Sequence, residues 1–187
     1  MSRAGKSAIL SLRPNVSEQD ALGAFRGPGL SAFYCRVLHG QLRRIAAAYV
    51  PFSLYRVEFE DGRARQTRFI AIDQVEGMLD LYEFPDALNP GELVKVMTRN
   101  ILAPTLPEES SRFLLRDKLQ RLIFQRGFFK AREPRLQLER LETQFNMPFW
   151  LGFYGQDGNL RCRVMDAVRR RMEGHKAVAL FKHWLAT

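Results

Sequence analysis

Two aspartates are the residues of this chain best placed to perform acid–base chemistry. Asp73 and Asp166 each end an apolar segment that we expect to be a strand returning from a hairpin. Across a pseudo-twofold axis the two carboxyl groups could approach each other and share a proton. An Asp at such a place more commonly accepts backbone N–H bonds in its own turn, and we expect that role here. A small-molecule enzyme with its carboxylate at Asp73 or Asp166 is therefore the third of three functional hypotheses.

The histidines and cysteines do not form a pattern typical of a metal site. Cys35 and His39 are four residues apart, but the sequence around them favours a strand, along which residues at that spacing lie too far apart for one ion. His175 and His183 are eight apart, about two helical turns, so one ion cannot join them within a helix. We expect no metal site and no cofactor.

Cys162 is the cysteine that most resembles a reactive thiol. It lies between Arg161 and Arg163, which would lower the pKa of an exposed thiol. Strand alternation, however, turns Cys162 to the face opposite the two arginines, so we expect a small core residue. Cys35 and Cys162 are both expected to be reduced and partly buried, and no catalytic nucleophile is predicted.

Arginine clusters are the strongest indication of a binding partner. Five arginines fall within eleven residues, with Asp166 as their one acidic neighbour: Arg161, Arg163, Arg169, Arg170 and Arg171. Arg65 and Arg161, 96 residues apart, are expected to be equivalent positions of a repeat. Because arginine forms paired hydrogen bonds to phosphate, this face is a candidate nucleic-acid surface. The simpler interpretation is a solvated face, as on the segment 108–125, where Asp117 and Arg121 are four residues apart.

An aromatic segment offers a second kind of site. Trp150 and Tyr154 flank Gly152 on one face of a predicted strand, while Phe149, Leu151 and Phe153 occupy the other face. Space beside Gly152 would allow a base or another flat ligand to stack on Trp150 and Tyr154. A strand that is apolar on both faces is usually central and covered on both sides. We therefore favour a core role for both residues.

The elements that position these residues appear twice in the sequence. Leu, Arg, aromatic, Pro, Phe, Leu and Asp-Gly follow one another from Leu42 to Gly62 and again from Leu138 to Gly158. The two copies are offset by 96 or 97 residues. Each copy predicts a long strand, an Asp-Gly hairpin and a returning strand. A repeat of this kind indicates internal duplication.

The pattern as a whole predicts an α+β fold, an antiparallel sheet built from two related strand–hairpin units with helices on one side. Asp166–Gly174 is either a turn plus a strand or the start of the last helix. The expected segments are a flexible arm (1–15), a first unit (16–88) with strands at 41–57, 64–72 and 78–84, a connecting helix and proline-containing linker (89–107), and a second unit (108–187) with helices at 108–125 and 176–185.

Size and charge limit the possible functions without choosing among them. The 187 residues carry a net charge of +9, distributed as +6 over residues 1–57, −6 over 58–109 and +9 over 110–187. No apolar stretch is long enough to span a membrane or act as a signal peptide, so we expect a cytoplasmic protein, bacterial in character. The leading hypothesis is a non-enzymatic binding or accessory protein, with a protein partner or a second copy possible. Nucleic-acid binding is the alternative.

Overall fold

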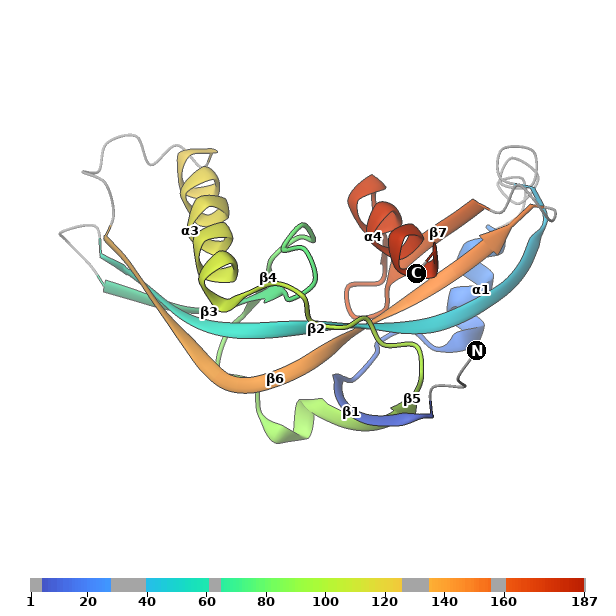
Figure 1. Cartoon of the computed structure of the whole chain (residues 1–187), viewed down its shortest axis with the longest axis horizontal. Helices are drawn as coiled ribbons and strands as arrows, with labels where there is room; N and C mark the ends of the chain where they lie inside the picture. Colours follow the sequence, from blue (N-terminus) through green and yellow to red (C-terminus); the bar gives the residue numbers. More distant parts are fainter. Residues whose placement is uncertain (1–4, 28–39, 61–64, 126–134, 156–160, 187) are drawn as a thin grey trace. The chain divides into compact units, whose positions relative to one another are not determined.

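The computed structural model describes residues 5–27, 40–60, 65–125, 135–155 and 161–186 (Figure 1). These residues form an α+β fold, with eight strands and three α-helices, which confirms the predicted class. The strands are β1 (Ser7–Leu12), β2 (Leu42–Glu60), β3 (Arg65–Asp73), β4 (Tyr82–Phe84), β5 (Leu93–Thr98), β6 (Arg135–Tyr154), β7 (Arg161–Asp166) and β8 (Arg171–Met172). The helices are α1 (Glu18–Arg26), α3 (Glu108–Gln125) and α4 (His175–Ala186), with a 3₁₀ turn, η1 (Pro90–Glu92).

The sheet is mixed, so the prediction of a purely antiparallel sheet is wrong. Its neighbours follow the order β4-β3-β2-β6-β1-β5, and β7 pairs with β6 and β8 with β7. The parallel contacts are Ser11 with Asn146, between β1 and β6, and the isolated bridge Tyr49 with Ile101. Both contacts are made by a connecting segment that runs beside a long strand and then leads into a helix. Such connecting chain can pair in either direction, and no hairpin turn fixes its direction.

Residues 89–101 do not form the predicted connecting helix, and this prediction is also wrong. The chain makes the 3₁₀ turn η1 and then enters strand β5. Val94 and Val96 alternate with Lys95 and Met97, a period of two that favours a strand, and β1 supplies a partner strand. Of the predicted strand 78–84, Tyr82–Phe84 alone form β4. After Asp166 the chain forms a turn and β8, which settles the alternative left open by the sequence.

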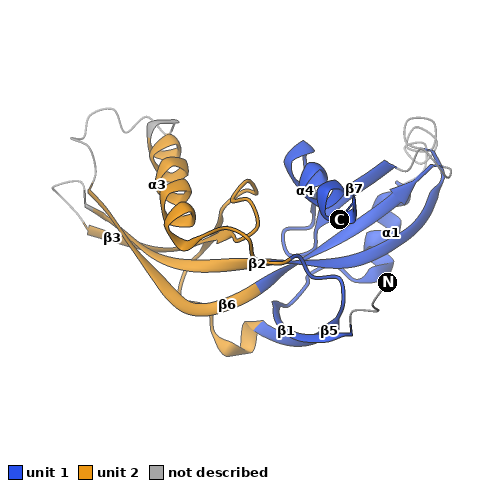
Figure 2. Ribbon diagram, viewed as in Figure 1, with its two compact units in different colours: residues 1–50, 93–102, 146–187 blue, residues 51–92, 103–145 orange. Residues whose placement is uncertain are grey.

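The chain divides into two compact units (Figure 2). Unit 1 comprises residues 1–50, 93–102 and 146–187, and unit 2 comprises residues 51–92 and 103–145. The long strands β2 and β6 each contribute residues to both units, so each unit takes segments from both halves of the sequence. A division by sequence order alone does not show this interleaving.

Unit 2 is built on the hairpin of β2 and β3. These strands pair antiparallel from Phe52–Asp73 to Glu60–Arg65, and the predicted Asp61-Gly62 turn lies outside the described residues. Leu115 and Leu119 of α3, four residues apart and therefore on one helical face, pack against Tyr55 and Ile70. On the other face of the hairpin, Phe52 contacts the rings of Tyr82 and Phe145. Phe52 and Leu54 are both buried.

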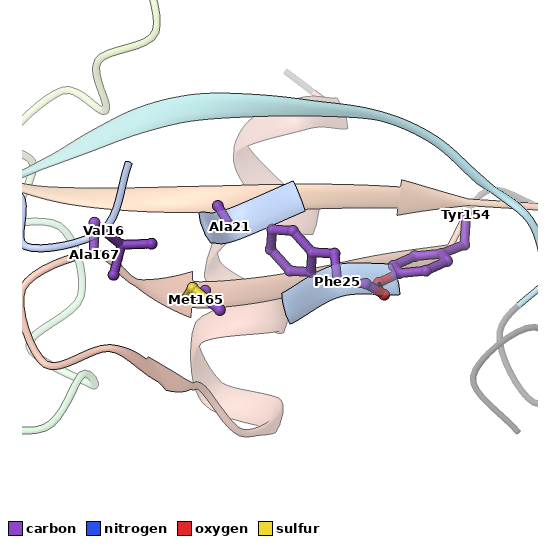
Figure 3. Close-up of a cluster of buried hydrophobic side chains, with 6 residues drawn as sticks. All are labelled: Val16, Ala21, Phe25, Tyr154, Met165 and Ala167. Atoms are coloured by element: carbon purple, nitrogen blue, oxygen red, sulfur yellow. Dashed lines mark hydrogen bonds between the residues drawn. The ribbon is translucent and has the colours of Figure 1, made fainter. Parts of the chain in front are cut away.

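Unit 1 is built on the hairpin of β6 and β7, which pair antiparallel from Phe149–Asp166 to Tyr154–Arg161. The predicted Asp157-Gly158 turn lies outside the described residues. Helix α1 begins after its cap Ser17, and Phe25 of α1 contacts Tyr154 edge to face at 6.5 Å between ring centroids. Figure 3 shows this cluster, which also contains Val16, Ala21, Met165 and Ala167.

Helices cover both faces of the hairpin in unit 1, which corrects the prediction of helices on one side. Phe149 contacts Phe181 of α4 at 5.5 Å between ring centroids. Gly152, three residues further along β6 and therefore on the opposite face, lies against Phe25 of α1. Phe149 and Leu151 are buried, as predicted for a central strand covered on both sides.

The turns that follow β3 and β7 are held by the same hydrogen bonds. The N–H of Gln74 donates to the carbonyl of Pro51 at 2.8 Å, and that of Ala167 donates to Pro148 at 3.1 Å. Phe52 is opposite Asp73 in one hairpin, and Phe149 is opposite Asp166 in the other. Each unit therefore joins the proline of its long strand to the residue that follows its aspartate.

The segments that lead into α1 and α3 bind these turns in the same way. The backbone N–H of Asn15 donates to Ala167 at 2.8 Å, and that of Thr105 donates to Gln74 at 2.9 Å. The side chains repeat the pattern one residue later, because Asn15 donates its amide to the carbonyl of Val168 and Thr105 its hydroxyl to that of Val75. Each helix entrance is thus fixed to the turn of a hairpin formed by the other half of the chain.

Candidate functional site

The five clustered arginines all belong to unit 1, on β7 and on the turn that connects it to β8. Arg161 is opposite Tyr154 and Arg163 is opposite Gly152, which places both on the face covered by α1. Arg169 and Arg170 lie in the turn, and Arg171 opens β8. Arg161, Arg170 and Arg171 are exposed, and Arg163 and Arg169 are half-buried. Arg171 is opposite Asp166 in the pairing of β7 with β8, so it lies on the face of the sheet opposite to Arg161 and Arg163, and the structure does not bring all five arginines to one face.

Acidic side chains of the same unit lie next to part of this cluster. Arg170 lies 4.0 Å from Asp20 of α1, and Nε of Arg171 donates to Glu173 at 3.0 Å. The Ser17 hydroxyl and backbone N–H, and to a smaller extent Arg170, lower the pKa of Asp20. Both side chains of the Arg170–Asp20 pair are exposed, so this pair contributes little to stability and competes weakly with another anion. Neither partner comes from the acidic segment 58–109.

The two units differ strongly in charge. Unit 1 contains 16 basic and 5 acidic residues, a net charge of +11, whereas unit 2 contains 13 and 15, a net charge of −2. These values sum to the +9 of the whole chain. The positive excess therefore belongs entirely to one unit, which the order of residues along the chain does not show.

Arg170 has an unusual backbone conformation. Its φ of 57° is the one positive value among the described non-glycine residues. Side chains with a β-carbon are disfavoured in this region by about 1–2 kcal/mol. Gly77, with a φ of 65°, lies four residues after Asp73, just as Arg170 lies four residues after Asp166. An arginine therefore occupies, in unit 1, the place at which unit 2 has a glycine.

Trp150 and Tyr154, the candidate stacking residues, belong to the core of unit 1. The indole N–H of Trp150 donates to the carbonyl of Val16 at 3.1 Å, and the Tyr154 hydroxyl donates to that of Phe25 at 2.7 Å. The space beside Gly152 is filled by the Phe25 ring, 2.8 Å from where a β-carbon would lie. A flat ligand has no room there, in agreement with the core role that the sequence favours.

Asp73 and Asp166, the candidate catalytic carboxylates, are both buried and each is bonded to the backbone of its own turn. Asp73 accepts four backbone N–H bonds, from residues 75, 76, 77 and 79, at 2.8 to 3.2 Å. Asp166 accepts N–H bonds from Val168 and Arg169, both at 2.8 Å. These hydrogen bonds are the ones expected of an aspartate that holds its own turn, which is the role that the sequence favours.

No cluster of three or more metal-ligating side chains occurs among the described residues. His175 and His183 are exposed on α4, and Cys35 and His39 lie outside the described residues. Cys162 is a free buried thiol, as predicted for a core residue. Burial raises its pKa to about 11, although the charge of Lys182 acts in the opposite direction.

Two features of the surface are not predicted by the sequence. One is a surface pocket on α3, lined by Glu108, Glu109, Arg112, Phe113 and Arg116. The other is the ribbon of β1 and β5, which leaves Leu10 and Met97 exposed. The alternation of Val94 and Val96 with Lys95 and Met97 was the signal for the second, but the Asn-Pro start of this segment favoured a helix instead.

None of the helices in the described part of the chain is both long enough and apolar enough to cross a membrane. Comparison of the whole sequence and structure with protein-family models, curated proteins and solved structures found no match, so the site has to be interpreted from its own geometry.

Proposed function

We propose that this chain is a non-enzymatic binding protein of the cytoplasm that takes a polyanion, nucleic acid, on unit 1. The observation that carries the proposal is the charge of +11 on unit 1 against −2 on unit 2. A body with such an excess attracts a polyanion over a long range and binds it with release of counterions. A surface that only keeps a protein soluble can carry both signs of charge mixed together, and it does not need positive charge concentrated on one unit.

The arginine cluster supplies the contact surface. Arg161 and Arg163 project from a paired strand, while Arg169 and Arg170 project from a turn that the buried Asp166 anchors. A fixed backbone lowers the entropy lost when an arginine binds a phosphate. Arg170 adds a further argument, because strained backbone is maintained most often where a side chain has a function.

The sequence repeat is part of the same proposal, because an internal duplication would explain how one unit became basic. The matched hydrogen bonds occur at offsets of 90 residues before the helices (Asn15 and Thr105), 97 in the long strands (Pro51 and Pro148) and 93 after the returning strands (Gln74 and Ala167). At the offset of 93, Arg163 and Arg169 replace Ile70 and Glu76. The second copy therefore gained arginines at positions where the first has none.

The offset of 93 residues replaces the predicted equivalence of Arg65 with Arg161. Val57 is opposite Arg68 in unit 2, and Tyr154 is opposite Arg161 in unit 1. Because Val57 and Tyr154 are matched at the offset of 97, Arg161 corresponds to Arg68 and not to Arg65. Arg68 forms an ion pair with Glu83, so the first copy uses its arginine within unit 2.

The experiment is a titration of a short fluorescent duplex DNA, followed by anisotropy over a range of salt concentrations. The test variant is Arg169→Glu with Arg170→Glu, and the control is Arg112→Glu with Arg116→Glu, which makes the same charge change on α3 of unit 2. We expect the test variant to bind about tenfold or more weakly at low salt and to reduce the salt slope by about 2. The control should change affinity by less than about threefold.

Two results would overturn the proposal. One is the absence of binding by the wild-type chain at low salt, where attraction to any polyanion is strongest. The other is an equal loss of affinity in both variants, because binding would then depend on total charge and not on unit 1. A single-stranded RNA of the same length, measured in parallel, identifies the preferred polymer.

A further inference from the structure

Strand β5 has one edge without a hydrogen-bonding partner in the described structure. It pairs with β1 from Leu93–Leu12 to Thr98–Ser7 and is the last strand in the sheet order. Among the described residues, no backbone hydrogen bond joins β5 to any segment other than β1. Its outer edge therefore presents N–H and C=O groups that another extended chain can pair with.

The outward face of the β1–β5 ribbon exposes two large apolar side chains, Leu10 and Met97, beside Lys95. The register places Ala8 opposite Met97 and Leu10 opposite Lys95 on this face. Leu10 is 49% exposed and Met97 is 57% exposed, although both lie in strands with well-formed pairing. Exposed large apolar side chains next to an open strand edge are typical of a surface that another chain covers.

Four cations lie on or beside this outward face. Lys6 precedes β1 and Arg99 follows β5 at one end of the ribbon, Arg13 follows β1 at the other end, and Lys95 lies between them. All four are exposed, and none has an ion pair or side-chain hydrogen bond within the described part of the chain. The nearest acidic residue in sequence, Glu92, accepts the backbone N–H of Asn89.

We propose that the outer edge of β5 binds an extended acidic segment of a partner protein, which adds to the sheet as a further strand. Backbone hydrogen bonds would supply affinity for any extended chain, and the side chains would supply specificity. Lys95, Met97 and Arg99 share one face, so carboxylates of the added strand next to Lys95 and Arg99 match the unpaired cations, and an apolar side chain two residues from each carboxylate covers Met97. A second copy fits this edge poorly, because it would bring its own Lys95 and a unit of charge +11.

The probe is a fluorescent peptide of about eight residues, blocked at both ends, in which every second residue is glutamate and valine in turn and the residues between them are threonine, so that one face of the extended peptide carries both types. Binding to the full chain is measured by anisotropy, for the wild type, for Lys95→Glu with Arg99→Glu, and for the control Lys176→Glu with Lys182→Glu on α4. We expect the β5 variant to bind about tenfold or more weakly, and the control to stay within about twofold. The Arg169→Glu with Arg170→Glu variant should retain peptide binding, which separates this edge from the arginine cluster.

Two further measurements test the backbone pairing itself. Hydrogen exchange of β5 amides should slow in the peptide complex, and a peptide N-methylated at alternate residues should lose affinity, because it cannot complete the ladder. The proposal is overturned if the methylated peptide binds equally well, if both charge variants weaken binding equally, or if the wild type does not bind. It is also overturned if the chain alone is a dimer that dissociates on Lys95→Glu with Arg99→Glu, since a second copy would then occupy the edge.

Discussion

The ring of Phe25 fills the space beside Gly152, so that a β-carbon added to Gly152 would lie 2.8 Å from the ring. Leu115 lies 90 residues after Phe25 and Tyr55 lies 97 residues before Gly152, and these two residues pack in one buried cluster of unit 2. Unit 1 therefore combines a large helix residue with glycine, and unit 2 combines a smaller helix residue with tyrosine. Reciprocal changes of volume of this kind would follow from the internal duplication that we propose.

Gly152→Ala is predicted to lower the free energy of unfolding by about 1–3 kcal/mol, because the Phe25 ring has no space to move into. In a Phe25→Leu background the same substitution should cost at least about 1 kcal/mol less, since leucine leaves room for the methyl group. Urea unfolding of the two single variants and the double variant measures this coupling. Additive costs would contradict the close approach of these two residues.

Asp73→Ala is predicted to lower the free energy of unfolding by about 3 kcal/mol, because four backbone N–H groups lose their acceptor and two of them, at Gly77 and Leu79, are buried. Asp73→Asn should cost less, since one oxygen remains as an acceptor. Asp86→Ala, which removes an exposed carboxylate of the same unit, is the control and should stay within about 0.5 kcal/mol. Chemical unfolding that gives Asp73→Ala the same midpoint as the control would refute the anchoring role.

Arg170→Gly is predicted to separate stability from binding. Glycine relieves the positive φ, so the free energy of unfolding should rise by up to about 1 kcal/mol. Removal of the guanidinium should weaken DNA binding at low salt. Arg170→Ala, which removes the charge but retains the β-carbon, should lose affinity without the gain in stability. A glycine variant that is less stable than the alanine variant would contradict the strain assigned to this residue.

Cys162 is predicted to react slowly with iodoacetamide at neutral pH and to reach half of its maximal rate near pH 11, because burial raises the pKa of its thiol to about 11. The fold favours the neutral thiol, so this group contributes stability below its ordinary pKa of about 9 and loses it as the pH rises towards 11. Mass spectrometry of tryptic peptides follows Cys162 separately from Cys35. A midpoint at or below pH 9 would contradict the burial of this thiol.

The hairpins and the long helix were predictable from local patterns. Alternation in residues 41–57 and 136–154 gave the long strands, and apolar positions at helical spacing gave α3. The turn role of Asp73 and the core role of Trp150 also followed from local sequence, because an Asp after a strand and a strand apolar on both faces each have one common structural use.

The interleaving of the two units was not predictable, because it depends on contacts between distant segments. Asn15 bonds to Ala167 and Thr105 bonds to Gln74, and neither residue has a local pattern that identifies its partner. The charge of unit 1 follows from this interleaving, so it could not be obtained from the linear order. The strand β5 was missed because its start resembles a helix start and its partner β1 is about 90 residues away.

Arginine footprinting tests the proposed site most directly, since it needs no variant. Phenylglyoxal modifies accessible guanidinium groups, and mass spectrometry compares each arginine with and without saturating duplex DNA. We expect protection of Arg161, Arg163, Arg169, Arg170 and Arg171 in unit 1, while Arg112, Arg116 and Arg121 on α3 continue to react at their original rates. Protection of the α3 arginines with no change in unit 1 would contradict the assignment of polyanion binding to the basic unit.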